Sequence, residues 1–221
     1  MIVDQLVNTS ILPLRSSDTV GMAIDCMDDN RVNHLPIVDG NNYLGLIVYA
    51  DISDIENQNT KLSELHAYWQ KPFIVEGEHY YIALQILNEQ NLSVLPVLDQ
   101  KNNFLGLISR DQVLGEMANT LSVQNPGGII VLELFQNDYS LTEISRIVES
   151  NDAKILSLNI KSIPDSRALE ITLKLNRINI EAIIQSFERF NYEIKAYFGE
   201  NRKDDDLLRE RYDSLLTYLN V

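Results

Sequence analysis

The sequence predicts an α+β protein: two copies of a short α/β unit, then a strand–helix–strand–strand–helix–strand domain, then a terminal helix. Two observations support this. Two stretches of the first half align at a fixed offset, and apolar residues in the second half follow helical and strand periodicities in turn. The expected boundaries are 1–60 and 61–122 for the copies, 123–128 for a linker, 129–200 for the second domain and 201–221 for the terminal helix.

The two copies align without a gap through their first helix and first strand. Residues 32–39 (VNHLPIVD) match residues 92–99 (LSVLPVLD) at an offset of 60. The second copy then gains one residue, so that residues 43–47 (YLGLI) match residues 104–108 (FLGLI) at an offset of 61. A unit of this size has too small a core to fold alone, so we expect the copies to pack together.

Each copy predicts a helix, a strand, a polar turn, a second strand and a second helix. Ser17 or Asp18 is the expected N-cap of the first helix, and the second helices are expected to start near Asp51 and Asp111. The strands are apolar almost throughout, which indicates burial of both faces. The apolar helix faces are Val20, Ile24 and Met27 in copy 1 and Tyr80, Leu84 and Leu87 in copy 2.

This pattern resembles the cystathionine-beta-synthase (CBS) domain, in the tandem arrangement called a Bateman module. The resemblance rests on residues 34–39 with 45–47 and on residues 94–99 with 106–109, and it covers residues 1 to about 120. It implies clefts between the copies that bind an adenosine-type ligand: AMP, ATP, S-adenosylmethionine or a cyclic dinucleotide. In the family, a Ser or Thr three residues after the glycine and an Asp three residues further on hold the ribose and phosphate.

Each copy keeps half of that pair. Copy 1 has Val48 in place of the hydroxyl and keeps Asp51, whereas copy 2 keeps Ser109 and has Gln112 in place of the Asp. A carboxylate can accept hydrogen bonds from both ribose hydroxyls, and a hydroxyl can contact a phosphate oxygen. The resemblance thus implies Asp51 for the ribose, Ser109 for the phosphate side and Arg110 as a phosphate cation. The other candidate ligand-binding residues are His34, Pro36, Val48, Val94 and Pro96.

Structural roles for the same residues remain open alternatives. Asp51 and Asp111 could cap helices, Arg110 could be a solvated charge, and His34 could be an ordinary surface or core histidine. If one copy alone binds a ligand, we expect it to be the copy that contains Asp51.

The second half predicts a ferredoxin-like order of elements. Strands are expected at 129–135, 154–163, 168–175 and 192–198, with Leu169, Ile171, Leu173 and Leu175 on one face of the third. Apolar helix faces are expected at Leu141, Ile144, Ile147 and Val148, and at Ile180, Ile183, Ile184 and Phe187. Behind a CBS pair, this order resembles an ACT domain, as in CBS–ACT proteins of the acetoin-utilisation type.

The loop between the first strand and helix of this half departs from the ligand loop of many ACT domains. Residues 136–141 (QNDYSL) contain neither Pro nor Gly, and Asp138 or Ser140 can cap the helix. We therefore favour a structural or dimerising role over amino-acid sensing. The terminal helix after Lys203 presents an apolar stripe that suits intramolecular packing or a dimer contact.

Composition narrows the function classes. The net charge of −14 disfavours nucleic acid and anionic lipid surfaces as partners. The single cysteine, Cys26, excludes an intrachain disulfide and favours a cytoplasmic location. The three histidines show no metal-ligand spacing, and no catalytic motif is present, so we expect neither a catalytic nor a metal site.

The leading hypothesis is a non-catalytic, homodimeric regulatory module that senses an adenosine-type ligand and acts on a protein partner that the sequence does not name. It needs no cofactor, although an adenine nucleotide or S-adenosylmethionine could be bound. One alternative is a ligand-free scaffold for dimerisation or partner binding. Another, less favoured, is an enzyme or accessory protein of small-molecule metabolism.

Overall fold

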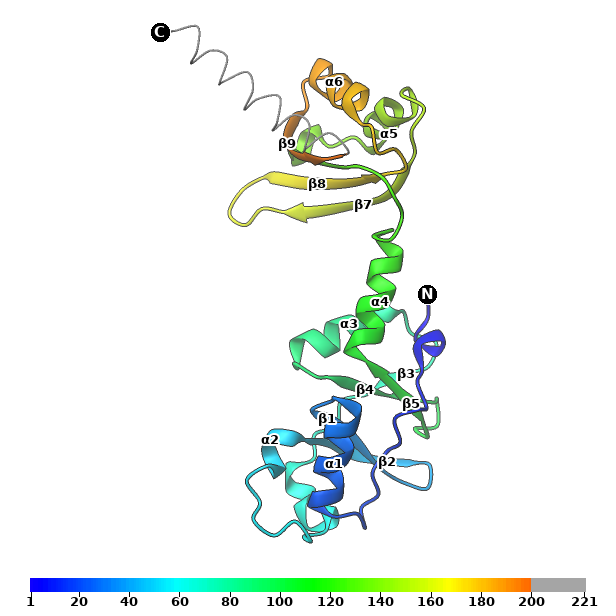
Figure 1. Ribbon diagram of the computed structural model, residues 1–221, viewed down its shortest axis with the longest axis vertical. Coiled ribbons are helices and arrows are strands. Elements are labelled where there is room, and N and C mark those ends of the chain that lie inside the picture. The colour runs from blue at the N-terminus through cyan, green and yellow to red at the C-terminus, as the bar shows by residue number, and fades with distance from the viewer. Residues whose placement is uncertain (200–221) are drawn as a thin grey trace, which may run out of the picture. The chain divides into compact units, whose positions relative to one another are not determined.

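The computed structural model describes residues 1–199, and these residues fall into two compact units (Figure 1). The first unit, Met1–Glu116, contains copy 1 and all of copy 2 except its end, and the second unit begins at Met117. The second helix of copy 2 runs across this boundary. The predicted terminal helix, residues 201–221, lies outside the described residues.

Copy 1 consists of α1 (Val20–Asn30), β1 (His34–Asp39), β2 (Asn42–Val48) and the single-turn α2 (Tyr49–Ile52). The N-cap prediction for α1 is wrong by one or two residues. Thr19 is the cap, and its side chain accepts a hydrogen bond from the Met22 amide, because Asp18 instead accepts one from the Arg15 amide.

Copy 2 repeats this order after a short first strand. It consists of β3 (Ile74–Val75), α3 (Tyr80–Glu89), β4 (Val94–Leu98), β5 (Phe104–Ser109) and α4 (Arg110–Thr120). The two hairpins share their register, since His34 pairs with Val48 as Val94 pairs with Ser109. The predicted duplication is therefore present in the backbone pairing. β4 is buried along its whole length and β1 at every residue except its last, as their apolar sequences indicate.

The copies exchange their first segments. The 3₁₀ helix η1 (Val3–Leu6) precedes copy 1, but the following Asn8 pairs with Leu107 on β5 of copy 2. The 3₁₀ helix η2 (Leu62–Tyr68) precedes copy 2, and the following Gln70 pairs with Leu46 on β2 of copy 1. Each copy is thus completed by a chain segment that precedes the other copy.

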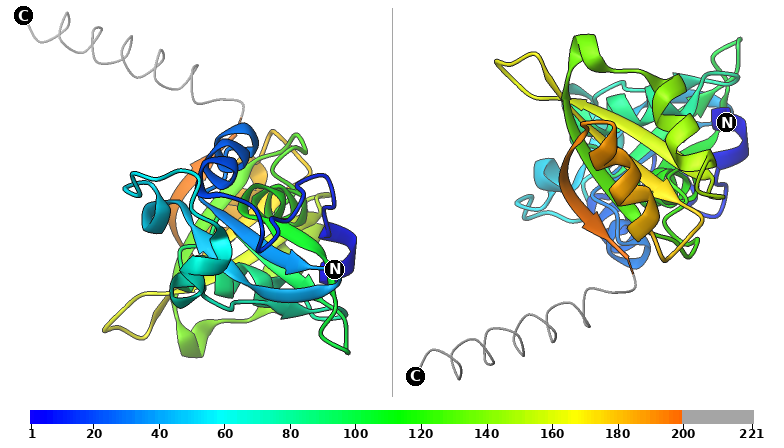
Figure 2. Two further views of the ribbon diagram at one scale, coloured as in Figure 1. Left: turned by 90° about the horizontal axis from the view of Figure 1, so that it is seen from below. Right: turned by 90° about the horizontal axis from the view of Figure 1, so that it is seen from above.

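The second unit is a four-stranded antiparallel sheet of order β7-β8-β6-β9. Its helices α5 and α6 cover the same face of the sheet (Figures 1 and 2). In chain order the elements are β6 (Ile129–Phe135), α5 (Leu141–Glu149), β7 (Ile155–Ser162), β8 (Ala168–Leu175), α6 (Glu181–Arg189) and β9 (Glu193–Phe198).

The core of this unit lies between the sheet and the two helices. The predicted alternation in β8 is confirmed, since Leu169, Ile171, Leu173 and Leu175 are all buried. Ser140 is the N-cap of α5 and accepts a hydrogen bond from the Glu143 amide. Leu141 does not join the predicted helix face: it is 49% exposed, whereas Ile144, Ile147 and Val148 are buried in the core of the unit.

Candidate functional site

Polar groups from both copies meet where the first residues of β1 and β4 lie side by side. We call Asn33, His34 and Ser93 the seam. Nδ1 of His34 accepts a hydrogen bond from the Ser93 amide at 3.2 Å and lies 3.0 Å from the Ser93 hydroxyl oxygen. That oxygen in turn accepts one from the Asn33 amide at 3.0 Å. The seam therefore joins the two copies through their equivalent positions, 33 and 93.

His34 is a buried histidine whose surroundings favour its neutral form. It is 8% exposed, and its pKa is lowered by burial first and then by the positive charge of Arg110, while Asp51 acts in the opposite direction. Because Nδ1 accepts the Ser93 amide, the ring proton of neutral His34 lies on Nε2. The two charge effects show that Asp51 of copy 1 and Arg110 of copy 2 both act on the same imidazole.

Asp51 has the properties of a free acceptor. It lies in α2, is exposed, and accepts no hydrogen bond from residues 1–199. It does not cap its helix, since the N-cap position is Val48, which makes no side-chain hydrogen bond. The capping alternative for Asp51 is therefore not supported by the geometry.

Ser109 and Gln112 of copy 2 bond to each other. The Ser109 amide and hydroxyl both donate to Oε1 of Gln112, at 2.9 and 3.0 Å, and the Gln112 amide donates back to the Ser109 hydroxyl oxygen at 3.2 Å. This reciprocal arrangement is a capping box at the start of α4. Nε2 of Gln112 also donates to the Leu6 carbonyl at 3.1 Å. The two positions that would hold a ligand in copy 2 are therefore already paired.

Arg110 has a structural anchor. Its Nη2 donates to the side-chain oxygen of Asn91 at 3.0 Å and, at 3.4 Å, to the Leu87 carbonyl. These acceptors lie at the C-terminal end of α3, where a cation is favoured by the helix dipole. The guanidinium has five N–H donors, so these contacts leave capacity for a further acceptor.

The remaining predicted residues differ in their access to solvent. Pro36, Val94 and Pro96 are buried within the hairpins, and Val94 is fully buried. A ligand could reach these three only if neighbouring side chains moved. Val48 is half-buried beside His34 in the register of β1 and β2.

Sequence reasoning did not identify Asn33, Ser93 or Leu6 as part of this region. Asn33 and Ser93 align at the offset of 60, and each is a polar residue directly before an apolar strand, which is the signal that marks them. Leu6 contributes through its carbonyl, and no side-chain pattern reveals a backbone contact.

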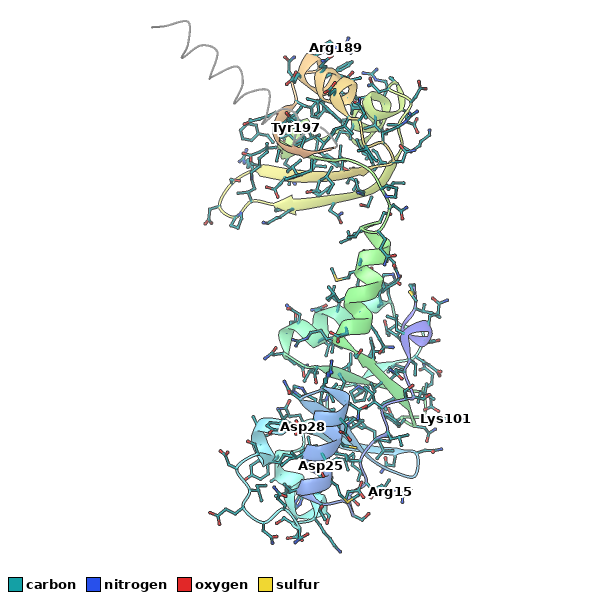
Figure 3. All side chains as sticks on the ribbon, in the orientation of Figure 1. Arg15, Asp25, Asp28, Lys101, Arg189 and Tyr197 are labelled. Carbon is teal, nitrogen blue, oxygen red and sulfur yellow. The ribbon has the colours of Figure 1, made fainter. Side chains whose placement is uncertain are left out.

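Within residues 1–199, no group of three or more His, Cys, Asp or Glu side chains could hold a metal ion, and no helix is long and apolar enough to cross a membrane. Burial, followed by Asp29, Asp18 and Asp25, raises the pKa of the Cys26 thiol, which disfavours the nucleophilic thiolate. Asp25 and Asp28 lie on the same helix, α1 (Figure 3).

The fold of the first unit defines a class: a paired-repeat module in which two α/β copies share segments and a polar seam. Residues 3–56 and 71–119 match the family model of the CBS domain, one match on each copy. The chain therefore carries a tandem pair of CBS domains, as the sequence resemblance implied.

Comparisons with known proteins fit this assignment. Inosine-5'-monophosphate dehydrogenase from Methanocaldococcus jannaschii is 28% identical over 115 residues, covering 50% of this chain and 22% of the enzyme. A CBS domain-containing protein from Dictyostelium discoideum is 26% identical over 141 residues, covering 57% of this chain and 97% of that protein. The chain thus spans about a fifth of the first relative and nearly all of the second.

Solved structures that are similar to part of this chain include a CBS domain pair/ACT domain protein and an acetoin utilization protein. A CBS domain pair/ACT domain protein from Thermotoga maritima has a TM-score of 0.49 at 21% identity, covering 55% of this chain and 99% of that one. An acetoin utilization protein from Vibrio cholerae has a TM-score of 0.47 at 20% identity, covering 56% of this chain and 95% of that one.

Proposed function

We propose that the CBS pair is a non-catalytic sensor of an adenosine-type ligand, which binds at copy 1 with Asp51 accepting hydrogen bonds from the ribose hydroxyls. The observation that carries this proposal is the Asp51 carboxylate, exposed and without a hydrogen-bond donor in residues 1–199. The charges of Asp51 and Arg110 both act on the imidazole of His34, in opposite directions. A negative acceptor for hydroxyls beside a cation for phosphate suits a nucleotide.

Ligand binding would be passed on through the hydrogen bonds that join the two copies at the seam. A ligand beside His34 favours one arrangement of the two copies, because His34 is hydrogen-bonded to Ser93 of the other copy. We propose that this preference changes the contacts of the module with a second copy of the chain or with a regulated protein.

We further propose that the second unit is an ACT-like domain with a ferredoxin-like fold that serves structure or dimerisation. The support is the order β7-β8-β6-β9 with both helices on one face. The β6–α5 loop contains a 3₁₀ turn (Gln136–Asp138) and the Ser140 cap, without a glycine that would let a ligand approach the backbone.

The test is a binding screen by thermal shift and calorimetry with AMP, ADP, ATP, S-adenosylmethionine and cyclic dinucleotides. A bound ligand raises the unfolding midpoint by mass action. Asp51→Asn should remove the shift, whereas the matched control Asp111→Asn, an equal charge change at an exposed residue of α4, should keep it. No shift with any ligand at millimolar concentration would contradict the proposal.

The ligand-free scaffold is the second candidate, and the paired state of Ser109 and Gln112 favours it. In that case Asp51→Asn alters no ligand response, and the purified protein carries no nucleotide by absorbance or mass spectrometry.

A further inference from the structure

Gln112 connects two parts of the first unit that are distant in sequence. Its Oε1 accepts from Ser109 at the start of α4, and its Nε2 donates to the carbonyl of Leu6 in η1. We call these contacts the Gln112 bridge. Both Ser109 and Gln112 are half-buried, so the bridge is partly shielded from water.

The bridge acts on a segment that is also held by the buried side chains of Val3 and Leu6 and by backbone hydrogen bonds. The Val3 amide donates to the Glu78 carbonyl at 2.9 Å, and Asn8 exchanges two hydrogen bonds with Leu107, at 2.8 and 3.1 Å. The Gln112–Leu6 contact adds a side-chain bond between these two attachments.

Copy 1 has no equivalent of this bridge. By the offset of 61, Asp51 stands where Gln112 does and Val48 where Ser109 does. A carboxylate cannot donate to a backbone carbonyl, and a valine side chain forms no hydrogen bond. The two copies therefore differ at equivalent positions: one has its polar groups paired internally, and the other has a carboxylate free.

We propose that the Gln112 bridge fastens the exchanged segment of residues 3–8 onto copy 2 and closes the ligand positions of that copy, so that the chain binds one ligand, at copy 1. The stoichiometry rests on the proposed function, whereas the fastening of the segment does not. A ligand that reached Ser109 would first have to break the bond between its hydroxyl and Oε1 of Gln112.

The fastening is tested without any ligand, by amide hydrogen exchange. Gln112→Glu keeps an acceptor for Ser109 but loses the donor to Leu6. We expect the Val3 and Asn8 amides to exchange up to about tenfold faster, in line with loss of one hydrogen bond. Ser109→Ala, which keeps the donor, should leave both rates unchanged. Unchanged rates in Gln112→Glu would overturn the fastening.

The closure is tested by counting bound AMP in calorimetry and equilibrium dialysis. We expect one AMP per chain for the wild type, none for Asp51→Asn, and two for Gln112→Asp, whose shorter carboxylate cannot donate to Leu6 and restores the side chain that Asp51 provides at the equivalent position of copy 1. Two AMP on the wild type, or one on Gln112→Asp, would overturn the closure. AMP binding by neither protein would overturn the proposed ligand and the stoichiometry, while the exchange rates still decide the fastening.

Discussion

Nδ1 of His34 accepts the backbone N–H of Ser93 at 3.2 Å, and these two residues belong to different CBS copies. An imidazole protonated on both nitrogens has no acceptor, so this bond exists only while His34 is neutral. Stability across the seam is therefore linked to the protonation of a single side chain.

The first prediction concerns pH. The folded-state pKa of His34 lies below its ordinary value of 6.5, because of burial and then Arg110, against a smaller effect of Asp51. The unfolded chain therefore takes up this proton first as the pH falls. The free energy of unfolding should be highest above pH 6.5 and decrease as the pH falls from there through the folded-state pKa. Urea unfolding at a series of pH values between 8 and 5 measures this.

The control is His34→Asn, whose side-chain oxygen can accept the Ser93 amide and does not titrate. It should retain stability near neutral pH and lose the component of the pH dependence that His34 provides. Identical pH profiles for this variant and the wild type would contradict the role of His34.

A second prediction concerns the Ser93 hydroxyl, which accepts from the Asn33 amide and lies 3.0 Å from Nδ1 of His34. Ser93→Ala leaves the Asn33 amide without this partner and should lower the free energy of unfolding by about 0.5–1.5 kcal/mol, the net contribution of one hydrogen bond. Ser10→Ala, at an exposed site, should stay within about 0.5 kcal/mol of the wild type. Chemical denaturation measures both; equal effects of the two variants would be evidence against the seam.

A third prediction concerns the close approach of the exchanged segments. An added Cβ at Gly45 would lie 2.7 Å from Cβ of Trp69, and one at Gly106 would lie 2.6 Å from Cγ1 of Val7. Gly45→Ala and Gly106→Ala should each destabilise the first unit by about 1–3 kcal/mol through overpacking. Gly115→Ala, in α4 with nothing within 4 Å, should instead stabilise by about 0.5–1 kcal/mol. The order of the three melting temperatures is the readout.

A fourth prediction concerns Tyr192 in the second unit, whose hydroxyl donates to Oε2 of Glu143 at 2.9 Å. Burial, followed by this hydrogen bond, raises its pKa from 10.0 to about 12. The folded state thus resists ionisation, and its stability should fall as the pH rises from 10 towards 12. Tyr192→Phe should lose this dependence and one late-titrating phenolate in ultraviolet absorbance. If the Tyr192 hydroxyl ionised near pH 10, the raised pKa would be contradicted.

Periodicity and repetition predicted most of the secondary structure, because burial imposes them on the sequence. The alternation of β8 and the matching hairpins follow directly from apolar side chains that share a core. The α1 cap was missed because Asp18 and Thr19 are both good capping residues, and only the local backbone decides between them.

The candidate site was less predictable than the fold. The paired state of Ser109 with Gln112 could be anticipated from the capping-box spacing, but the Gln112 contact with Leu6 joins residues 106 positions apart. The exchanged pairings of Asn8 and Gln70 use backbone groups, which every residue except proline carries alike. Such contacts leave no signature in a single sequence.

The exchange of first segments also sets an order of events during synthesis. Gln70 leaves the ribosome 24 residues after its partner Leu46, whereas Asn8 leaves 99 residues before its partner Leu107. Copy 1 can therefore acquire its completing segment early, while residues 3–8 must stay undocked until β5 is made. Because long-range pairings form slowly, we expect the seating of residues 3–8 to be a late step in folding. A nascent chain stopped short of β5 should expose this segment to proteases.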